Sequence, residues 1–287
     1  MVASGVVTGV TALINVMKDR VLYSPNFPDG DARFLYKNPE GYRNPGERNI
    51  AYEDVYLDTD DGLVLHGWHI KQADHLRPTI LFFHGNAGNM GMRMDNIEDF
   101  YVQLGVNIFI LSYRGYGKSQ GHPTEEGLKL DAKAAIEYLF SSNIVNKDQV
   151  FIFGRSLGGA VGIYATHEFQ SKYKIRGLIL ENTFTSINDI ASDLAPSMKA
   201  LSSLFLQKQW PSLSRIRSIR SPILFISGRN DLLIAPHHMD SLHQNSQQSA
   251  FTEFHAVAQA GHNDTYSKAW PEYLNWMNSF ITKSLLL

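Results

Sequence analysis

Cysteine is absent from this chain of 287 residues. Its absence excludes disulfides, thiolate metal sites, iron–sulfur clusters and a cysteine nucleophile. A basic excess is also lacking, because 26 lysine and arginine residues stand against 28 aspartate and glutamate residues. Without surplus positive charge to neutralise phosphates, we expect no nucleic-acid partner. Hydrophobic residues make up 44% of the chain and charged residues 19%, which excludes global disorder and allows a large buried core.

The N-terminus has an unusual composition. Residues 1–17 carry no charge, eleven of them are Ala, Val, Ile, Leu or Met, and Lys18 and Arg20 follow. This length is at the short limit for crossing a hydrocarbon core, and the basic residues after it are typical of a helix end at the lipid interface. We expect a short membrane anchor within residues 1–20, or alternatively an ordinary helix. The protein would then be membrane-associated through this segment or cytoplasmic, with its orientation left open.

The rest of the chain predicts an irregular linker followed by one α/β domain. Residues 21–50 hold four prolines, which favour irregular structure. Residues 51–287 begin with a predicted hairpin, formed by Val55–Thr59 and Leu63–Ile70 around an Asp-Asp-Gly turn. Short apolar runs then alternate with helical segments, which predicts a mostly parallel sheet with helices on both faces. These runs are Thr79–Phe83, Val106–Leu111, Val150–Phe153, Leu178–Leu180, Ile223–Ile226 and Phe251–Val257.

A long insertion separates two of these strands. It covers residues 183–220 and contains a stretch with helical character at Leu194–Leu206, followed by Trp210 and Pro211. In a compact domain an insertion of this length is often a lid over a binding site. We therefore predict a lid there.

Two pentapeptides match the pattern G-x-S-x-G, and their context distinguishes them. Ser156 follows directly on the strand Val150–Phe153 and precedes small residues that start a helix, which is the strand–turn–helix context of a nucleophile elbow. Ser119 instead lies in a glycine-rich loop several residues past its strand and just before His122. We predict that Ser156 is the nucleophile and that Ser119 is not.

A serine hydroxyl is a weak nucleophile and needs a base, which in turn needs an orienting acid. Asp231 and His262 each follow a predicted strand downstream of Ser156, and the carboxyl ends of parallel strands gather at one edge of a sheet. Asp231 is therefore the predicted acid and His262 the predicted base. The alternatives are a turn or capping role for Asp231 and Glu181 as the acid. Three further histidines, His237, His238 and His243, are interpreted as a solvated helix face without the spacing of a zinc site.

An oxyanion hole needs two backbone N–H groups, one after the nucleophile and one from the loop after an early strand. Leu157 would supply the first, and Asn86, in the loop after Thr79–Phe83, would supply the second. His84 precedes the serine in the chain, so we interpret it as a structural support of this loop. No metal or cofactor is expected.

Five motifs together resemble a eukaryotic family of serine hydrolases, typified by α/β-hydrolase domain-containing protein 13 and the bud-emergence-type proteins of plants and fungi. The likeness covers about residues 20–285, and its motifs stand in the family's order. They are His84-Gly85-Asn86-Ala87-Gly88-Asn89, Ser112-Tyr113-Arg114-Gly115-Tyr116-Gly117, Gly154-Arg155-Ser156-Leu157-Gly158-Gly159, Glu181-Asn182-Thr183-Phe184-Thr185-Ser186 and Gly261-His262-Asn263-Asp264-Thr265. The resemblance implies the eight-stranded α/β-hydrolase fold and the triad Ser156, Asp231 and His262.

These observations predict a metal-independent serine hydrolase acting on a small acyl ester or an acylated protein. Within this class, an acyl-protein thioesterase is one alternative. A non-catalytic binding protein on the same fold is another, although such proteins typically lose a triad member and none is lost here.

Overall fold

A computed structural model of the chain describes residue 19, residues 22–194 and residues 209–287. The predicted anchor at residues 1–17 and the stretch from residue 195 to 206 lie outside the described residues. In the described ranges, no helix has both the length and the apolar character needed to cross a membrane.

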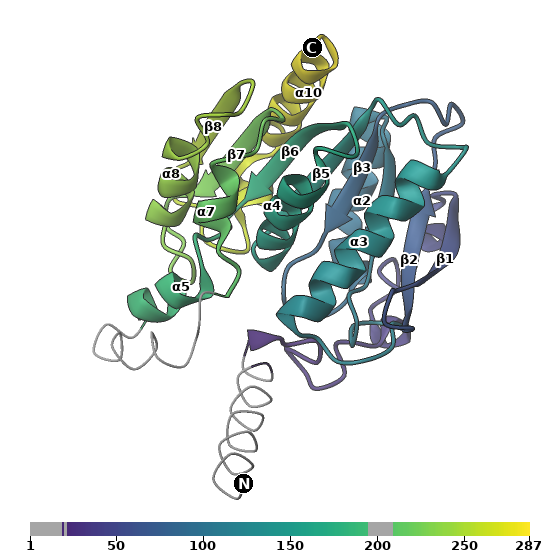
Figure 1. Cartoon of the computed structure of the whole chain (residues 1–287). Helices are drawn as coiled ribbons and strands as arrows, with labels where there is room; N and C mark the ends of the chain where they lie inside the picture. The colour runs from purple at the N-terminus through teal and green to yellow at the C-terminus, as the bar shows by residue number, and fades with distance from the viewer. Residues whose placement is uncertain (1–18, 20–21, 195–208) are drawn as a thin grey trace, which may run out of the picture.

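An eight-stranded, mostly parallel sheet forms the centre of the molecule, as predicted (Figure 1). The predicted hairpin is confirmed: β1 (Tyr52–Asp58) and β2 (Val64–Ile70) are antiparallel. The strands lie in the order β1-β2-β4-β3-β5-β6-β7-β8, and every pair from β4 to β8 is parallel. The remaining strands are β3 (Thr79–Phe83), β4 (Asn107–Leu111), β5 (Val150–Arg155), β6 (Ile175–Glu181), β7 (Ile223–Gly228) and β8 (Thr252–Val257).

Helices cover both faces of the sheet because successive strand side chains point to opposite faces. In β3, Leu81 and Phe83 pack in the layer under α3, α4, α7 and α8, whereas Ile80 and Phe82 pack in the layer under α2 and α10. Both sets are fully buried, which explains why the strands read as continuous apolar runs. The helices are α2 (Met94–Asp99), α3 (Glu125–Ser141), α4 (Leu157–Phe169), α5 (Ile187–Leu194), α7 (Ser212–Ile216), α8 (His237–Gln244), α9 (Thr265–Ala269) and α10 (Glu272–Leu285).

Residues 22–50 are irregular, as expected, but they are packed onto the domain and do not form a free linker. Their regular elements are two short 3-10 helices, Leu35–Lys37 and Pro45–Arg48. Tyr23 is buried, and the side chains of Asn38 and Asn89 hydrogen-bond each other at 2.9 Å. Proline content predicted the irregularity but could not show that the segment packs on the sheet domain.

The insertion between β6 and β7 is described in two parts, which include α5 and α7. Its second part begins with the buried Gln209 and Trp210, and the Trp210 indole donates a 3.0 Å hydrogen bond to the Tyr23 hydroxyl. The insertion therefore contacts the N-terminal segment. Its role as a lid stays a prediction.

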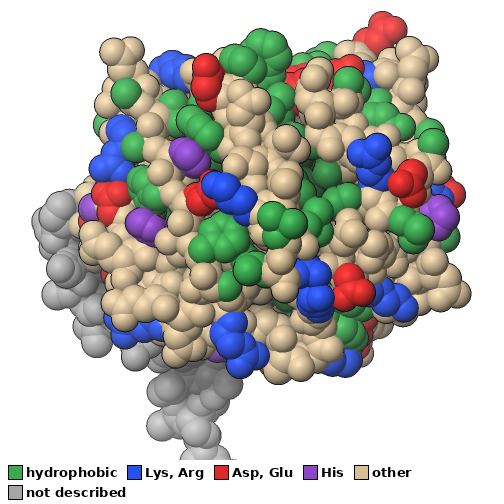
Figure 2. All heavy atoms as spheres, turned by 90° about the horizontal axis from the view of Figure 1, so that it is seen from above, with side chains coloured by type: hydrophobic (Ala, Val, Ile, Leu, Met, Phe, Trp, Pro, Cys, Tyr) green, Lys and Arg blue, Asp and Glu red, His purple; other side chains and the backbone are tan. Residues whose placement is uncertain are grey.

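Charge is evenly mixed on the face shown in Figure 2, where basic and acidic side chains alternate without a continuous patch of one sign. This agrees with the formal net charge of −2.

Candidate active site

Ser156 lies in a tight turn between β5 and α4. Its φ of 55° and ψ of −122° are a strained combination for a non-glycine residue. The flanking positions have room only for glycine, because a Cβ on Gly154 would lie 2.2 Å from the Gly158 oxygen. A Cβ on Gly158 would lie 2.0 Å from the Phe83 oxygen. The G-x-S-x-G pattern around Ser156 therefore corresponds to a real steric constraint.

The structure brings the three predicted triad residues together from the ends of three strands. His262 Nε2 lies 3.0 Å from Ser156 Oγ, and His262 Nδ1 lies 2.7 Å from Asp231 Oδ2. The other oxygen of the buried Asp231 accepts hydrogen bonds from the backbone N–H groups of Leu233 and Ile234, at 2.9 and 2.8 Å. The carboxylate is thus fixed with one oxygen aimed at the imidazole.

Glu181, the alternative acid, interacts with other groups. Its Oε1 forms an ion pair with Arg155 Nε at 3.2 Å, and its Oε2 accepts a 2.6 Å hydrogen bond from the Tyr273 hydroxyl. Burial and the neighbouring Glu181 raise the pKa of Tyr273 well above its usual range, so Tyr273 stays a donor. Among the described contacts of Glu181, none reaches the His262 ring.

Arg155 and Asn182 support the histidine loop, and sequence reasoning did not assign them this role. Arg155 donates a 2.8 Å hydrogen bond to the His262 main-chain oxygen. The Asn182 amide donates to the same oxygen at 3.2 Å and to Thr265 Oγ1 at 2.8 Å, while its oxygen accepts from Gly228 N at 2.8 Å. Both residues lie inside motifs noted above. The sequence feature that could have identified them is a charged or amide side chain at the end of an otherwise apolar strand.

The loop after β3 passes directly beside the nucleophile. A Cβ on Gly85 would lie 3.7 Å from Ser156 Cβ, in ordinary contact. Among the described residues, no group accepts a hydrogen bond from the backbone N–H of Asn86 or of Leu157, the first residue of α4. Both N–H groups are therefore available to an oxyanion.

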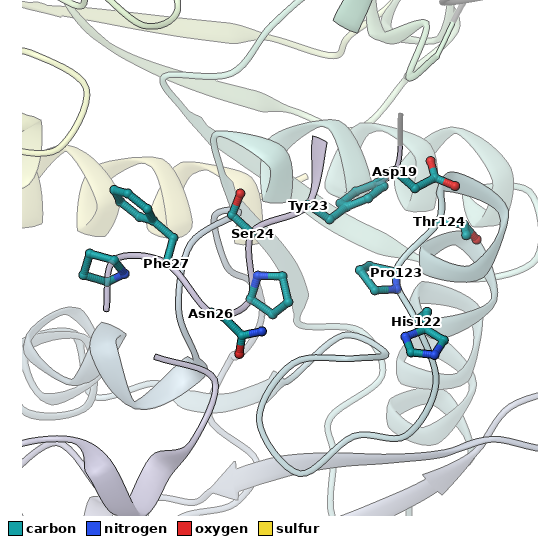
Figure 3. A pocket seen from close by; sticks show the side chains of 10 residues that line it. Asp19, Tyr23, Ser24, Asn26, Phe27, His122, Pro123 and Thr124 are labelled. Atoms are coloured by element: carbon teal, nitrogen blue, oxygen red, sulfur yellow. The ribbon is translucent and has the colours of Figure 1, made fainter. Parts of the chain in front are cut away.

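The Asn86 side chain is held by the N-terminal segment and by Tyr116. Its oxygen accepts hydrogen bonds from the Tyr116 hydroxyl at 2.7 Å and from Ser24 N at 3.1 Å, and its amide donates to the Leu22 oxygen at 2.7 Å. A cavity of about 630 Å³ adjoins this contact, with Tyr23, Ser24 and Phe27 among its lining residues (Figure 3). His122 and Pro123 line the cavity from another loop (Figure 3).

His84 and Ser119 have structural contacts. The fully buried His84 donates from Nδ1 to the Gly85 oxygen at 2.7 Å, and burial lowers the pKa of His84 to about 3, so the ring is neutral. Ser119 Oγ accepts from His66 N at 2.9 Å and donates to the Ser112 oxygen at 2.6 Å. Ser119 thus links a loop to a strand.

The prediction of a solvated face for His237, His238 and His243 is wrong for His238, which is fully buried. Met239 and Leu242 of α8 are buried as well, so one side of this short helix packs inward. Because Leu242 lies four residues after His238, helical periodicity places the two on the same inward side.

Comparisons with known proteins are consistent with this geometry. A sequence model of the alpha/beta hydrolase fold family matches residues 78–209. The chain is 35% identical to "Alpha/beta hydrolase domain-containing protein WAV2" of Arabidopsis thaliana, over 97% of this chain and 92% of that one. It is 41% identical to "Protein bem46" of Schizosaccharomyces pombe, over 85% and 80%. It is 38% identical to an uncharacterized membrane protein of Saccharomyces cerevisiae, over 81% and 83%.

Solved structures show the same fold at low sequence identity. An alpha-beta hydrolase from Vibrio vulnificus superposes with a TM-score of 0.71 at 19% identity, covering 89% of this chain and 91% of that one. The esterase Pf2001 of Pyrococcus furiosus superposes with a TM-score of 0.68 at 21% identity, covering 84% and 96%. These likenesses show that the chain has the α/β-hydrolase fold.

Proposed function

This chain belongs to the α/β-hydrolase family, among its bem46-type members, and on that premise we propose that it is a serine hydrolase. It cleaves an ester or thioester bond through an acyl-enzyme intermediate. The observation that supports this most directly is the hydrogen-bonded line from Ser156 through His262 to Asp231.

In the first half of the reaction, Ser156 Oγ attacks the substrate carbonyl carbon while His262 Nε2 takes the hydroxyl proton. Asp231 accepts the hydrogen bond from Nδ1 and stabilises the imidazolium that forms. The backbone N–H groups of Leu157 and Asn86 stabilise the oxyanion of the tetrahedral intermediate. The bond to the alcohol or thiol then breaks, and His262 donates its proton to the leaving group.

In the second half, His262 takes a proton from water, and the resulting nucleophile attacks the acyl-serine. The tetrahedral intermediate collapses to a carboxylic acid, and the proton returns to Ser156.

Labelling with a fluorescent fluorophosphonate tests this proposal, because the reagent forms a covalent bond only with an activated serine. We expect the wild-type chain and Ser119→Ala to be labelled and Ser156→Ala to stay unlabelled. A folded wild-type chain that is not labelled would contradict the proposal. A panel of p-nitrophenyl and thioester substrates of increasing acyl length then identifies the preferred substrate class.

A further inference from the structure

Three side chains of metal-binding type converge between α5 and α8. Asp193 lies near the end of α5, and His237 and His238 begin α8. Asp193 Oδ2 lies 2.8 Å from His237 Nε2 and 3.0 Å from His238 Nε2. The three ligand atoms all lie within 4.8 Å of one another. Two imidazole nitrogens therefore face one carboxylate oxygen.

His238 Nε2 is a buried polar atom without a hydrogen bond. The residue is fully buried, and no described group satisfies this nitrogen. Asp193 Oδ2 is close enough at 3.0 Å but lies off the direction along which the ring nitrogen would donate. An unsatisfied buried nitrogen beside a group of ligand atoms requires an explanation, and a bound ion is one that recurs in proteins.

The other nitrogen of His238, Nδ1, faces Thr185. Thr185 Oγ1 lies 2.5 Å from Asp189 Oδ2, and because a carboxylate only accepts, the threonine hydroxyl donates its single hydrogen there. His238 Nδ1 lies 2.8 Å from the same Oγ1 and donates to it in the tautomer that carries the hydrogen on Nδ1. In the other tautomer Nδ1 accepts, and the Thr185 backbone N–H, 3.3 Å away, donates to it. An ion at the cluster would select the tautomer with the hydrogen on Nδ1, which leaves a lone pair on Nε2.

We propose that Asp193, His237 and His238 bind a divalent transition-metal ion of the Zn²⁺ type. Zn²⁺ commonly takes imidazole nitrogens and a carboxylate oxygen at about 2.0–2.2 Å, with water completing a tetrahedron. Such a tetrahedron separates neighbouring ligand atoms by about 3.3 Å, so the observed 2.8 and 3.0 Å must open only slightly. Asp193 and His237 are both partly exposed and free to make this adjustment.

The surroundings of the cluster agree with this assignment. A cavity of about 270 Å³ adjoins it and is also lined by Ser192 and Ser241, which leaves room for a water ligand. The contact from His238 Nδ1 through Thr185 to Asp189 is the kind of outer hydrogen bond that orients metal-binding histidines in proteins. These contacts do not involve the Ser156 chemistry, so the metal proposal stands or falls independently of the proposed function.

A bound ion would join two segments that flank the candidate active site. Asp193 belongs to the first helix of the insertion between β6 and β7, and His237 follows six residues after Asp231. The ion would cross-link these segments in the folded chain only, and ligands that bind only the folded state raise its stability.

Titration of the full, untagged, chelator-treated chain with Zn²⁺ alone tests the proposal. We expect isothermal titration calorimetry to give one Zn²⁺ per chain and thermal unfolding to shift upward by at least about 3 °C at saturating Zn²⁺. His237→Ala and Asp193→Asn change exposed side chains, so both variants should fold. Each should weaken Zn²⁺ binding at least about tenfold, whereas His75→Ala, which removes an exposed histidine elsewhere, should bind as the wild type does.

Two results would overturn the proposal. One is the absence of stoichiometric Zn²⁺ binding to the wild-type chain. The other is wild-type affinity in both His237→Ala and Asp193→Asn, which would show that Zn²⁺ binds elsewhere and that the cluster is only an ion pair.

Discussion

The Arg155 guanidinium donates a 2.8 Å hydrogen bond to the main-chain oxygen of His262. Arg155 immediately precedes Ser156, so the residue next to the proposed nucleophile also holds the loop that carries the proposed base. The buried Glu181 forms an ion pair with Arg155 and accepts a hydrogen bond from the Tyr273 hydroxyl. These contacts fix the position of the guanidinium. The relative position of serine and histidine thus depends on a buried ion pair as well as on the turn itself.

Replacing Arg155 by Met should reduce both stability and turnover. Glu181 would be left buried without a cation, and removing one partner of a buried pair costs about 3–5 kcal/mol. Loss of the bond to the His262 oxygen should lower kcat at least about tenfold with little change in KM, because a positioning contact is removed and no substrate contact. Urea unfolding and steady-state kinetics on a soluble p-nitrophenyl ester measure the two effects.

The double variant Arg155→Met, Glu181→Gln separates the two roles. It removes the unpaired charge and should recover part of the lost stability without recovering kcat. If Arg155→Met alone had wild-type stability and wild-type kcat, the ion pair would have neither role.

Replacing Asp231 by Asn should leave the fold intact and lower kcat by about 10⁴, the size found for the corresponding change in a serine protease. The backbone N–H groups of Leu233 and Ile234 would keep the amide oxygen, so the NH₂ group would face His262 Nδ1. The imidazole would then carry its hydrogen on Nε2 and could not accept the Ser156 proton. Near-normal kcat in this variant, together with a large loss in Glu181→Gln, would assign the acid to Glu181 instead.

Ser156→Ala should abolish ester turnover, whereas Ser119→Ala should keep it at a lower stability. Ser119 satisfies two buried backbone groups, the His66 N–H and the Ser112 oxygen, and leaving such groups unpaired costs about 1–3 kcal/mol. Thermal unfolding and turnover of a soluble ester, measured on both variants, distinguish the roles. Loss of turnover in Ser119→Ala alone, with its fold intact, would show that the wrong serine has been assigned.

Stability should fall on acidification below about pH 6.5 because two histidines are buried in the neutral form. Burial lowers the pKa of His69 to about 4 and that of His84 to about 3. The unfolded chain takes up these protons near pH 6.5, so the contribution is fully present above that pH. It decreases toward pH 4 for His69 and pH 3 for His84, by at most about 1.4 kcal/mol per pH unit for each.

Urea unfolding at pH 7.5 and pH 5 measures the slope of the free energy of unfolding against pH. The substitution His69→Gln should reduce this slope. The exposed His75, replaced by Gln, serves as the control and should leave the slope unchanged. Equal slopes in the wild type and His69→Gln would mean that His69 does not contribute to the acid sensitivity.

The features that the sequence predicted correctly are those that local sequence patterns determine. The five residues Thr79–Phe83 form β3 as expected, since continuous apolar runs are typical of buried parallel strands. The meeting of Ser156, Asp231 and His262 followed from topology, because each comes after the carboxyl end of a strand in one sheet. The Asn182 contacts depend on how distant elements pack, which local sequence patterns do not record, whereas the four-residue spacing of His238 and Leu242 could have predicted the burial of His238. Distant packing also brings together Ser24 and Asn86, which meet across 62 positions of the chain.

The contacts of the N-terminal segment predict how far the chain can be shortened. Residues 1–17, expected to bind a membrane, precede Leu22 and Ser24, which bond to the Asn86 side chain, and Tyr23, which bonds to Trp210. A chain that starts at Val21 should therefore lose membrane association but keep wild-type kcat on a soluble ester.

A chain that starts at Asp29 should fold yet lose at least about tenfold in kcat, because the carboxamide of Asn86 loses two of its three partners and its backbone N–H is no longer held in position. Membrane fractionation and steady-state kinetics on the three chains check both statements. Equal partitioning of the full chain and the Val21 chain would remove the anchor, and wild-type kcat in the Asp29 chain would show that the segment does not position Asn86.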